Sequence, residues 1–368
     1  MRIFAALLLS PILAQDSNPW KPTDKASEIL KELQSKHPES EGYRHGAFGY
    51  IAHACKTDET QFERTNRFLR TYADWAAKNL FEKKPEILRV VSFAKTADFQ
   101  TFSGGRGSAG YYRHSERMLV NNLETGLGTA GHEMTHALMY ADWSSGSPNP
   151  WFREGFAAMM ENSLRRSDGT FIGIGYSHWR YVRVVRPGIE RGSLPPLREL
   201  MKSGRADPNA YAVGRWICTY LYAKGLLKKF HDEFRASAGS DASGVGALEK
   251  ATAKSVEDFE KEWKEWSKDL EAEISDIQGG GRFPVLGIIG RNRPEGLVAA
   301  AVAPGSAAAA AQVQVGDVVE EIDGKAVKTM AELLELISKK KEGDKVKVVF
   351  GRDGVSWSAT VVLDQFIG

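Results

Sequence analysis

Two histidines four positions apart, with a glutamate beside the first, are the residues of this chain best suited to chemistry: His132, Glu133 and His136. On an α-helix this spacing places both imidazoles on one face, one turn apart, where they can share a metal ion. Glu133 is rotated by about 100° from His132, so it reaches the space beside the metal. This H-E-x-x-H pattern predicts that the histidines bind zinc and that the glutamate acts as a general base. The alternative is an amphipathic helix with two partly buried histidines.

A catalytic zinc site takes three protein ligands and keeps one position for water, so a third ligand is expected. Glu154 follows His136 by eighteen positions. The segment 144–150, rich in serine and proline, breaks the first helix, and the run from Trp151 begins a second one. A hairpin of these two helices brings Glu154 towards the histidines. The alternative for Glu154 is a glutamate on the surface of a helix.

The segments HEMTH (132–136) and WFREGFA (151–157) together resemble the gluzincin branch of zinc metallopeptidases, particularly the bacterial peptidase-MA-like proteins. In that family the third ligand is the glutamate of an E-G-[FL]-A segment. The resemblance implies one Zn²⁺ per chain, bound by His132, His136 and Glu154, with Glu133 as catalytic base.

The same resemblance points to an oxyanion donor at the start of a later helix. Tyr211, with a glycine three positions on, resembles the gluzincin Y-x-x-G segment, although Val213 stands where the family often has lysine. A tyrosine packed at a helix start is the alternative. Three other residues are rivals for the role: Tyr176, His178 and Tyr181.

Two further site residues are expected beside the zinc ligands. Glu161 lies about two helical turns after Glu154 and would orient a histidine if it faced the site; the alternative is a solvated glutamate. In gluzincins a strand just before the zinc helix forms the edge of the sheet, and extended substrate pairs with it. By that resemblance the candidate edge strand is Met118-Leu119-Val120-Asn121, and an ordinary paired strand is the alternative.

A different kind of sequence follows residue 282. Short β-like runs at 285–289, 296–300, 318–322, 346–350 and 356–363 surround a helix expected at 330–339. The segments PGSAA (304–308) and VGDVV (315–319) resemble the permuted PDZ domains attached to bacterial proteases. That resemblance implies peptide binding at a carboxylate loop with contacts from Leu286, Gly287 and Ile288. A domain packed on its own enzyme as a structural cap is the alternative.

The predicted fold class is α+β: a zincin-like metallopeptidase domain, with a small mixed sheet and helices, followed by a permuted, β-barrel-like PDZ domain. The expected boundaries are 20–274 for the first domain, 275–282 for a linker and 283–368 for the PDZ domain. In the first domain we expect these elements: helices at 23–36, 58–81, 197–202, 209–223, 226–234, 246–253 and 256–274, strands at 47–55, 86–93, 111–113 and 117–121, and a strand or loop at 171–176.

The N-terminus and composition limit the cellular setting. Residues 1–14 place one basic residue before a short apolar run that ends in alanine, which predicts a signal peptide cleaved near Ala14 and a secreted or periplasmic protein. The run is too short for a stable membrane span. A net charge of +2 gives no footprint for nucleic acid. Cys55 and Cys218 are compatible with one disulfide or with two buried thiols.

The predicted function is an exported zinc metallopeptidase that binds peptide C-termini through its PDZ domain. No G-x-M-E-N segment, with which gluzincin aminopeptidases hold a free amine, precedes the zinc helix, so an endopeptidase is favoured. The alternatives are a PDZ binding protein on a non-catalytic, zinc-stabilised scaffold and a hydrolase of non-peptide amides.

Overall fold

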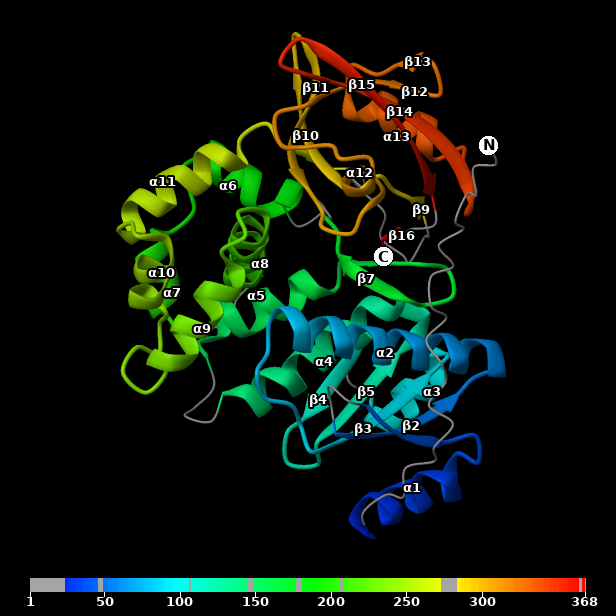
Figure 1. Ribbon diagram of the computed structural model, residues 1–368. Coiled ribbons are helices and arrows are strands. Elements are labelled where there is room, and N and C mark those ends of the chain that lie inside the picture. Colours follow the sequence, from blue (N-terminus) through cyan, green and yellow to red (C-terminus); the bar gives the residue numbers. More distant parts are fainter. Residues whose placement is uncertain are drawn as a thin grey trace, which may run out of the picture.

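The computed structural model describes residues 24–45, 49–105, 107–143, 148–176, 181–204, 208–272, 283–363 and 366–367. The expected signal peptide (1–14), the expected linker (275–282) and His178 lie outside these residues. The described chain has a mixed α+β fold that ends in a β-rich C-terminal region (Figure 1).

The first sheet is five-stranded and mixed, with the strand order β1-β2-β3-β5-β4. Its three central strands, β2, β3 and β5, run parallel, whereas β1 and β4 are antiparallel to their neighbours. The strands expected at 86–93, 111–113 and 117–121 are confirmed. The observed bounds are β1 (Glu41–Arg44), β2 (Tyr50–Lys56), β3 (Ile87–Phe93), β4 (Gly110–Arg113) and β5 (Met118–Asn122).

Alternating side chains of this sheet build two cores, because successive strand residues point to opposite faces. Leu88 and Val90 of β3 face one core, and Ile87 and Val91 face the other. Helices α2 (Glu59–Asn79) and α4 (Leu127–Asp142) cover the first face, and α1 (Asp24–Lys36) and α3 (Thr96–Ser103) cover the second (Figure 1). A short 3₁₀ turn, Leu123–Thr125, leads from β5 into α4.

The prediction that Met118–Asn121 forms the sheet edge is wrong. These residues belong to β5, which pairs with β3 on one side and with β4 on the other. The edge strand is instead β4, the first arm of the β4–β5 hairpin. The sequence predicts both strands but not which of them is the edge strand, because both carry apolar side chains. The strand order is decided by the parallel pairing of β5 with β3.

The segment 148–272 is mostly helical, as expected. A short antiparallel pair of strands, β6 (Ser163–Arg165) and β7 (Phe171–Ile174), follows its first helix. A π-helical turn, Tyr181–Val185, precedes α6. The helices are α5 (Pro150–Met160), α6 (Arg186–Glu190), α7 (Leu197–Lys202), α8 (Pro208–Ala223), α9 (Leu227–Ser237), α10 (Val245–Thr252) and α11 (Val256–Ser267).

Helices α5 and α8 cross in backbone contact at two glycines. A Cβ atom on Gly155 would lie 2.4 Å from the carbonyl carbon of Gly214, and a Cβ on Gly214 would lie 2.0 Å from the carbonyl oxygen of Trp151. No side chain larger than hydrogen fits at either position, so the glycines set the separation of the two helices.

Helix α11 ends earlier than the helix expected at 256–274. Its last residue is Ser267, Asp269 has a positive φ of 54°, and Glu271–Ala272 form strand β8. β8 pairs with strand β10 (Ile288–Arg293) of the C-terminal region. The expected helix is wrong at this end because an unpaired strand edge offers backbone hydrogen bonds, and this tertiary pairing outweighs helical periodicity.

The C-terminal region forms a second sheet in the order β15-β14-β12-β11-β10-β8, with its own apolar core. The expected strands are confirmed, except that the first begins at Ile288 because residues 285–287 form a loop. Two helices and a short strand complete the region. The bounds are β11 (Gly296–Val302), α12 (Ala307–Ala310), β12 (Val318–Ile322), β13 (Lys325–Ala326), α13 (Met330–Ile337), β14 (Asp344–Arg352) and β15 (Val355–Leu363).

The C-terminal region packs tightly on the rest of the chain. Strand β16 (Phe366–Ile367) pairs with β6 on one side and with β9 (Phe283–Pro284) on the other. Ile289 of β10 and Ala301 of β11 are part of the large core of the preceding helices. These contacts agree with the structural-cap interpretation and leave the peptide-binding one open.

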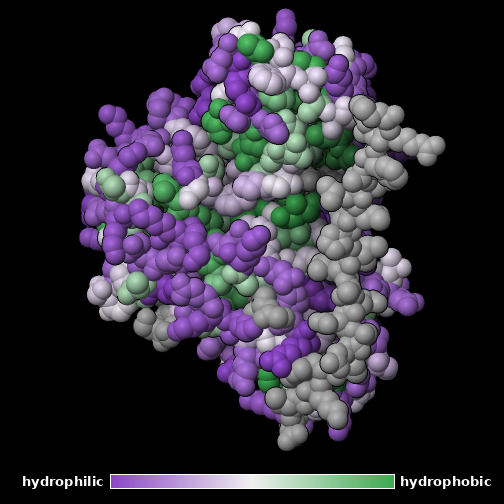
Figure 2. All heavy atoms as spheres, in the orientation of Figure 1, coloured by the Kyte–Doolittle hydropathy of each residue, from purple (hydrophilic) through white to green (hydrophobic). Residues whose placement is uncertain are grey.

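Hydrophilic side chains cover most of the face seen in Figure 2, whereas hydrophobic ones gather in its upper half, over the C-terminal region around α12. Among the described residues, no helix is both long and apolar enough to cross a bilayer. Cys55 and Cys218 are buried and free, so the two-thiol alternative holds in this structure.

We expect Gly214→Ala to destabilise the protein by about 2–3 kcal/mol, because the added methyl group overlaps the Trp151 carbonyl and the helices must separate. Urea unfolding measures the free energy. Gly239→Ala is the control, since a Cβ at Gly239 meets no atom within 4 Å. Equal stability of both variants would contradict a tight crossing.

Candidate metal centre and PDZ domain

Helix α4 holds His132 and His136 in buried positions, 7% and 9% exposed. It lies in backbone contact with the C-terminal end of α5. A Cβ on Gly128 would approach the Glu161 carbonyl oxygen to 2.8 Å, and a Cβ on Gly131 would approach the Met160 carbonyl oxygen to 3.2 Å. The two helices are therefore as close as their main chains allow, which lets short side chains meet between them.

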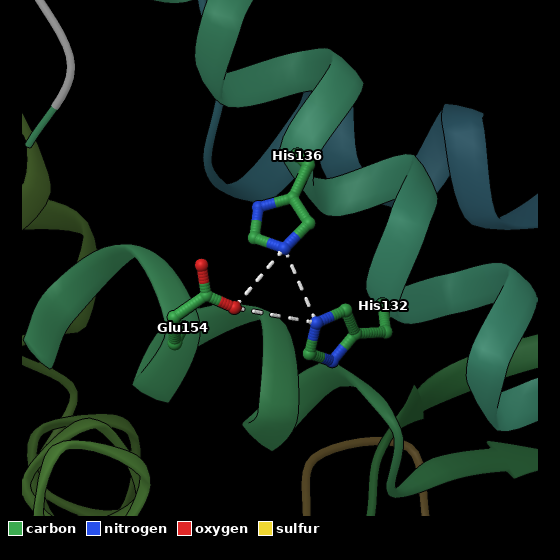
Figure 3. A group of neighbouring side chains, drawn as sticks. All are labelled: His132, His136 and Glu154. Atoms are coloured by element: carbon green, nitrogen blue, oxygen red, sulfur yellow. Dashed lines mark hydrogen bonds and ion pairs between the residues drawn. The ribbon is translucent and has the colours of Figure 1, made fainter. Parts of the chain in front are cut away.

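Glu154 of α5 points at both histidines. Its Oε2 lies 3.7 Å from His132 Nε2 and 3.4 Å from His136 Nε2, and the two Nε2 atoms are 3.2 Å apart. Figure 3 shows the three side chains converging from α4 and α5. Burial would raise the pKa of Glu154, but hydrogen bonds to His132, His136 and Arg153 hold it well below its usual value. Glu154 therefore presents a charged carboxylate to the two histidines, which is the form that could bind a metal ion.

The three atoms fit a zinc ion by type and by distance. Zinc–ligand bonds of about 2.0–2.1 Å in a tetrahedron place neighbouring ligand atoms about 3.3 Å apart. The observed separations of 3.2, 3.4 and 3.7 Å lie around this value. Two imidazole nitrogens that face each other at 3.2 Å also need either a hydrogen atom on one of them or a metal ion between them.

Glu161 and a buried arginine hold the far side of His132. Glu161 Oε1 accepts a hydrogen bond from His132 Nδ1 at 2.8 Å, and Arg215 Nη1 donates to Glu161 Oε2 at 3.1 Å. Arg215, 3% exposed, also donates to Asn162. Because Nδ1 donates, the lone pair of a neutral His132 lies on Nε2. Burial would lower the pKa of His132, but bonds to Glu154 and Glu161 raise it to about 10. The cluster therefore favours positive charge.

Glu133 is not one of the three residues of the His-His-Glu triangle. No described residue makes a hydrogen bond or ion pair with its carboxylate, which is 8% exposed. Burial raises its pKa, and the neighbouring histidines oppose that effect. Its Cγ would lie 3.2 Å from a Cβ on Gly110, the first residue of β4. A carboxylate with a raised pKa and no partner is suited to take a proton.

Tyr211 is the oxyanion candidate that α8 brings to the cluster. Its hydroxyl lies 3.1 Å from His132 Nε2, and its ring stacks on that of His132 with an interplanar angle of 8°. Tyr181 donates instead to the Ser267 carbonyl, and Tyr176 packs beside Tyr222. Of the described rivals, neither is placed at the cluster.

Sequence reasoning missed Arg215 and Asn162. One signal was available: Arg215 follows Tyr211 by four residues, so both lie on one face of an otherwise apolar helix. The two histidines also differ in a way that neighbouring sequence does not reveal. His136 Nδ1 is buried and has no hydrogen-bond partner among the described residues, whereas His132 Nδ1 has Glu161.

The loop before β10 is held through two of its carbonyl groups. Gly287 has a φ of 88°, and a Cβ there would lie 2.2 Å from Ser306 Cβ. The carbonyl of Leu286 accepts from Ala308 N–H at 2.8 Å, and that of Gly287 accepts from Ala303 N–H at 2.8 Å. Because N–H and C=O oppose each other across a trans peptide, the N–H groups of residues 287 and 288 point away from α12.

Residues 284–363 match the family model of the PDZ domain. This segment is a PDZ domain. PDZ domains add an extended peptide to a sheet edge, so peptide binding is the activity that this part of the chain supports. The resemblance seen at 304–308 and 315–319 is thereby confirmed.

Outside the PDZ domain, the similarities to known proteins are to solved structures with low scores. No curated protein matches the chain. Among solved structures, an aminopeptidase N family protein from Idiomarina loihiensis aligns over 89% of this chain and 68% of its own, at 12% identity and a TM-score of 0.39. Aminopeptidase A from Legionella pneumophila aligns over 61% of this chain and 27% of its own, at 12% identity and 0.36.

A serine endoprotease from Yersinia pestis aligns over 23% of this chain and 29% of its own, at 23% identity and a TM-score of 0.21. This chain therefore spans less than a third of the Yersinia protein. At such scores the similarities assign neither a fold nor an activity to residues 24–272.

We expect Arg215→Met to weaken zinc binding by about 10- to 100-fold, because Glu161 loses the cation that fixes it behind His132. Competition with a chromophoric chelator measures the zinc dissociation constant. Arg67→Met, which removes an exposed ion pair with Asp168, is the control and should leave it unchanged. If a folded Arg215→Met protein bound zinc as tightly as the wild type, the contact between Arg215 and Glu161 would have no effect on zinc affinity.

Proposed function

We propose that the chain is a zinc-dependent peptidase with a gluzincin-like site and a PDZ domain that binds peptide C-termini. One observation carries the proposal: a His-His-Glu triangle of zinc dimensions has two further groups near it, the carboxylate of Glu133 and the hydroxyl of Tyr211. A purely structural zinc site would use four protein ligands and would need neither residue.

Each residue has a distinct task in amide hydrolysis. His132, His136 and Glu154 would hold the zinc ion, which when bound supplies Lewis acidity towards water and carbonyl oxygen. Glu133 takes a proton from the attacking water and passes it to the leaving amine. The Tyr211 hydroxyl donates a hydrogen bond to the oxyanion that develops on the substrate carbonyl.

The substrate is proposed to lie along β4. This strand is the edge of the first sheet, and its first residue, Gly110, lies near the Glu133 side chain, whose Cγ would be 3.2 Å from a Cβ at that position. A peptide added to the edge would pass beside the base with its backbone paired. Cleavage within chains is proposed over removal of single N-terminal residues, since the sequence before α4 has no G-x-M-E-N segment. Export of the protein is proposed from residues 1–14 alone.

We expect one zinc ion per chain in protein purified without chelator, lost in Glu154→Gln and kept in Glu133→Gln. The reason is that Glu154 is a ligand atom of the triangle, whereas Glu133 is not. Mass spectrometry gives the metal content, and an internally quenched peptide library reports hydrolysis, which should fall by about 10²–10⁴-fold in Glu133→Gln. Wild-type protein that takes up no zinc when it is offered would leave peptide binding by the PDZ domain as the better account.

We expect Tyr211→Phe to lower kcat by about 10²–10³-fold with little change in KM or zinc content, since the hydroxyl acts on the transition state. Steady-state kinetics on a cleaved peptide separates the two constants. Tyr220→Phe removes a hydroxyl from the same helix, one that bonds to Glu262, and serves as control. An unchanged kcat in Tyr211→Phe would move the oxyanion role to another residue.

A further inference from the structure

The outer edge of β10 is covered by the chain's own strand β8. Ala272 pairs with Ile289 and Glu271 pairs with Gly290, in antiparallel orientation. On its other side β10 pairs with β11, so β8 occupies the last position of the PDZ sheet. β8 lies outside the PDZ domain proper, since it directly follows helix α11 of the preceding region.

This edge is the one that a PDZ ligand needs. The loop 286–288, whose N–H groups point away from α12, leads directly into β10. A peptide whose terminal carboxylate is held by that loop continues along the free edge of the next strand. We propose that β8 is an intramolecular occupant of the peptide-binding edge, and that an external chain terminus binds only when it displaces β8.

Contacts on both sides of β8 hold it in place. Leu270, immediately before it, is fully buried. Glu271 Oε1 lies 3.5 Å from Arg186 Nη1 of α6. On the β10 side, Arg291 donates to the Trp266 carbonyl at the end of α11, and Arg293 lies 3.6 Å from Asp269. Glu271 and Ala272 are thus paired with β10 through the backbone, and the residues before them are held to the same strand by the side chains of Arg291 and Arg293.

The occupant has an entropic advantage over an external peptide. A strand joined to the folded chain at Leu270 is present at a high effective concentration, whereas a free peptide loses translational freedom on binding. The apparent affinity for a free peptide is reduced by the fraction of molecules in which β8 has left the edge. The proposal concerns the PDZ domain and is independent of the proposed peptidase activity.

Binding of a defined probe to the full chain tests the proposal. The probe is a pool of fluorescein-labelled heptapeptides with free C-termini ending in Ala, Val, Leu, Ile or Phe, and the amidated pool is the negative probe. Glu133→Gln is used as background so that the probe is not cleaved. Glu271→Pro with Ala272→Pro removes the N–H group that β8 directs at β10, whichever of the two residues carries it, because successive N–H groups of a strand point to opposite sides. We expect this open variant to bind at least about tenfold more tightly than the background protein by fluorescence anisotropy.

Glu271→Ala is the matched control for the open variant. It loses the contact with Arg186 but keeps the backbone donor, so binding should change by less than about threefold. Equal binding by the open variant and the background protein would overturn the proposal. Failure of the open variant to bind either pool would also overturn it, because a vacated edge should then accept a carboxyl-terminal strand.

A disulfide tests the same edge in the closed state. Ile289→Cys with Ala272→Cys places two thiols on directly paired residues, within disulfide reach. The native Cys55 and Cys218 are buried, and burial raises the pKa of both thiols, so they do not compete. We expect the oxidised protein to lose binding of the carboxylate pool and the same protein to regain it on reduction. Binding that is equal in both redox states would contradict displacement of β8.

Discussion

The backbone contact between Gly155 and Gly214 is the constraint on which the rest of the site depends. It fixes the separation of α5, which carries Glu154, from α8, which carries Tyr211 and Arg215. Packed helices usually lie about 8–10 Å apart, a distance set by the side chains at their contact. Because only hydrogen atoms stand at the crossing, Glu154 of one helix and Tyr211 and Arg215 of the other reach the same small volume. A methyl group at either glycine would move Glu154 relative to Tyr211 and Arg215.

Charge explains why so many ionisable groups tolerate burial beside that contact. Uncompensated buried charge costs several kcal/mol, whereas paired charges with satisfied hydrogen bonds can be accommodated. Arg215 balances Glu161, and Glu161 in turn holds the proton of His132 Nδ1. Glu154 faces two imidazole nitrogens through Oε2 and pairs with Arg153 through Oε1. The three carboxylates Glu133, Glu154 and Glu161 therefore have two arginine partners, and the charge balance favours a further cation at the triangle. Geometry and charge therefore lead to the same type of ligand.

Sequence reasoning worked where the information is local. The four-residue spacing of His132 and His136 on a helix, and the strands of the PDZ domain at 318–322 and 346–350, follow from periodicities of 3.6 and 2. It failed where distant segments decide. The order of β4 and β5 depends on pairing with β3, and the end of α11 depends on β10, neither of which leaves a mark in the nearby residues. The bond between Arg215 and Glu161 depends in the same way on the packing of α5 against α8.

The PDZ domain is joined at both ends to the elements that hold the metal centre. Strand β16, which follows the domain, pairs with β6, and β6 begins two residues after Glu161. The first sheet position of the domain is taken by β8, which follows α11, and α11 packs on α8 through a hydrogen bond from Trp216 Nε1 to Ser267 Oγ at 2.9 Å. Tyr211 and Arg215 lie on the same α8. A domain anchored in this way contributes to the position of the site whether or not it binds a peptide, so the structural-cap and peptide-binding interpretations describe one set of contacts. The proposed displacement of β8 would occur four residues after Ser267, which holds α11 to α8 through its bond with Trp216.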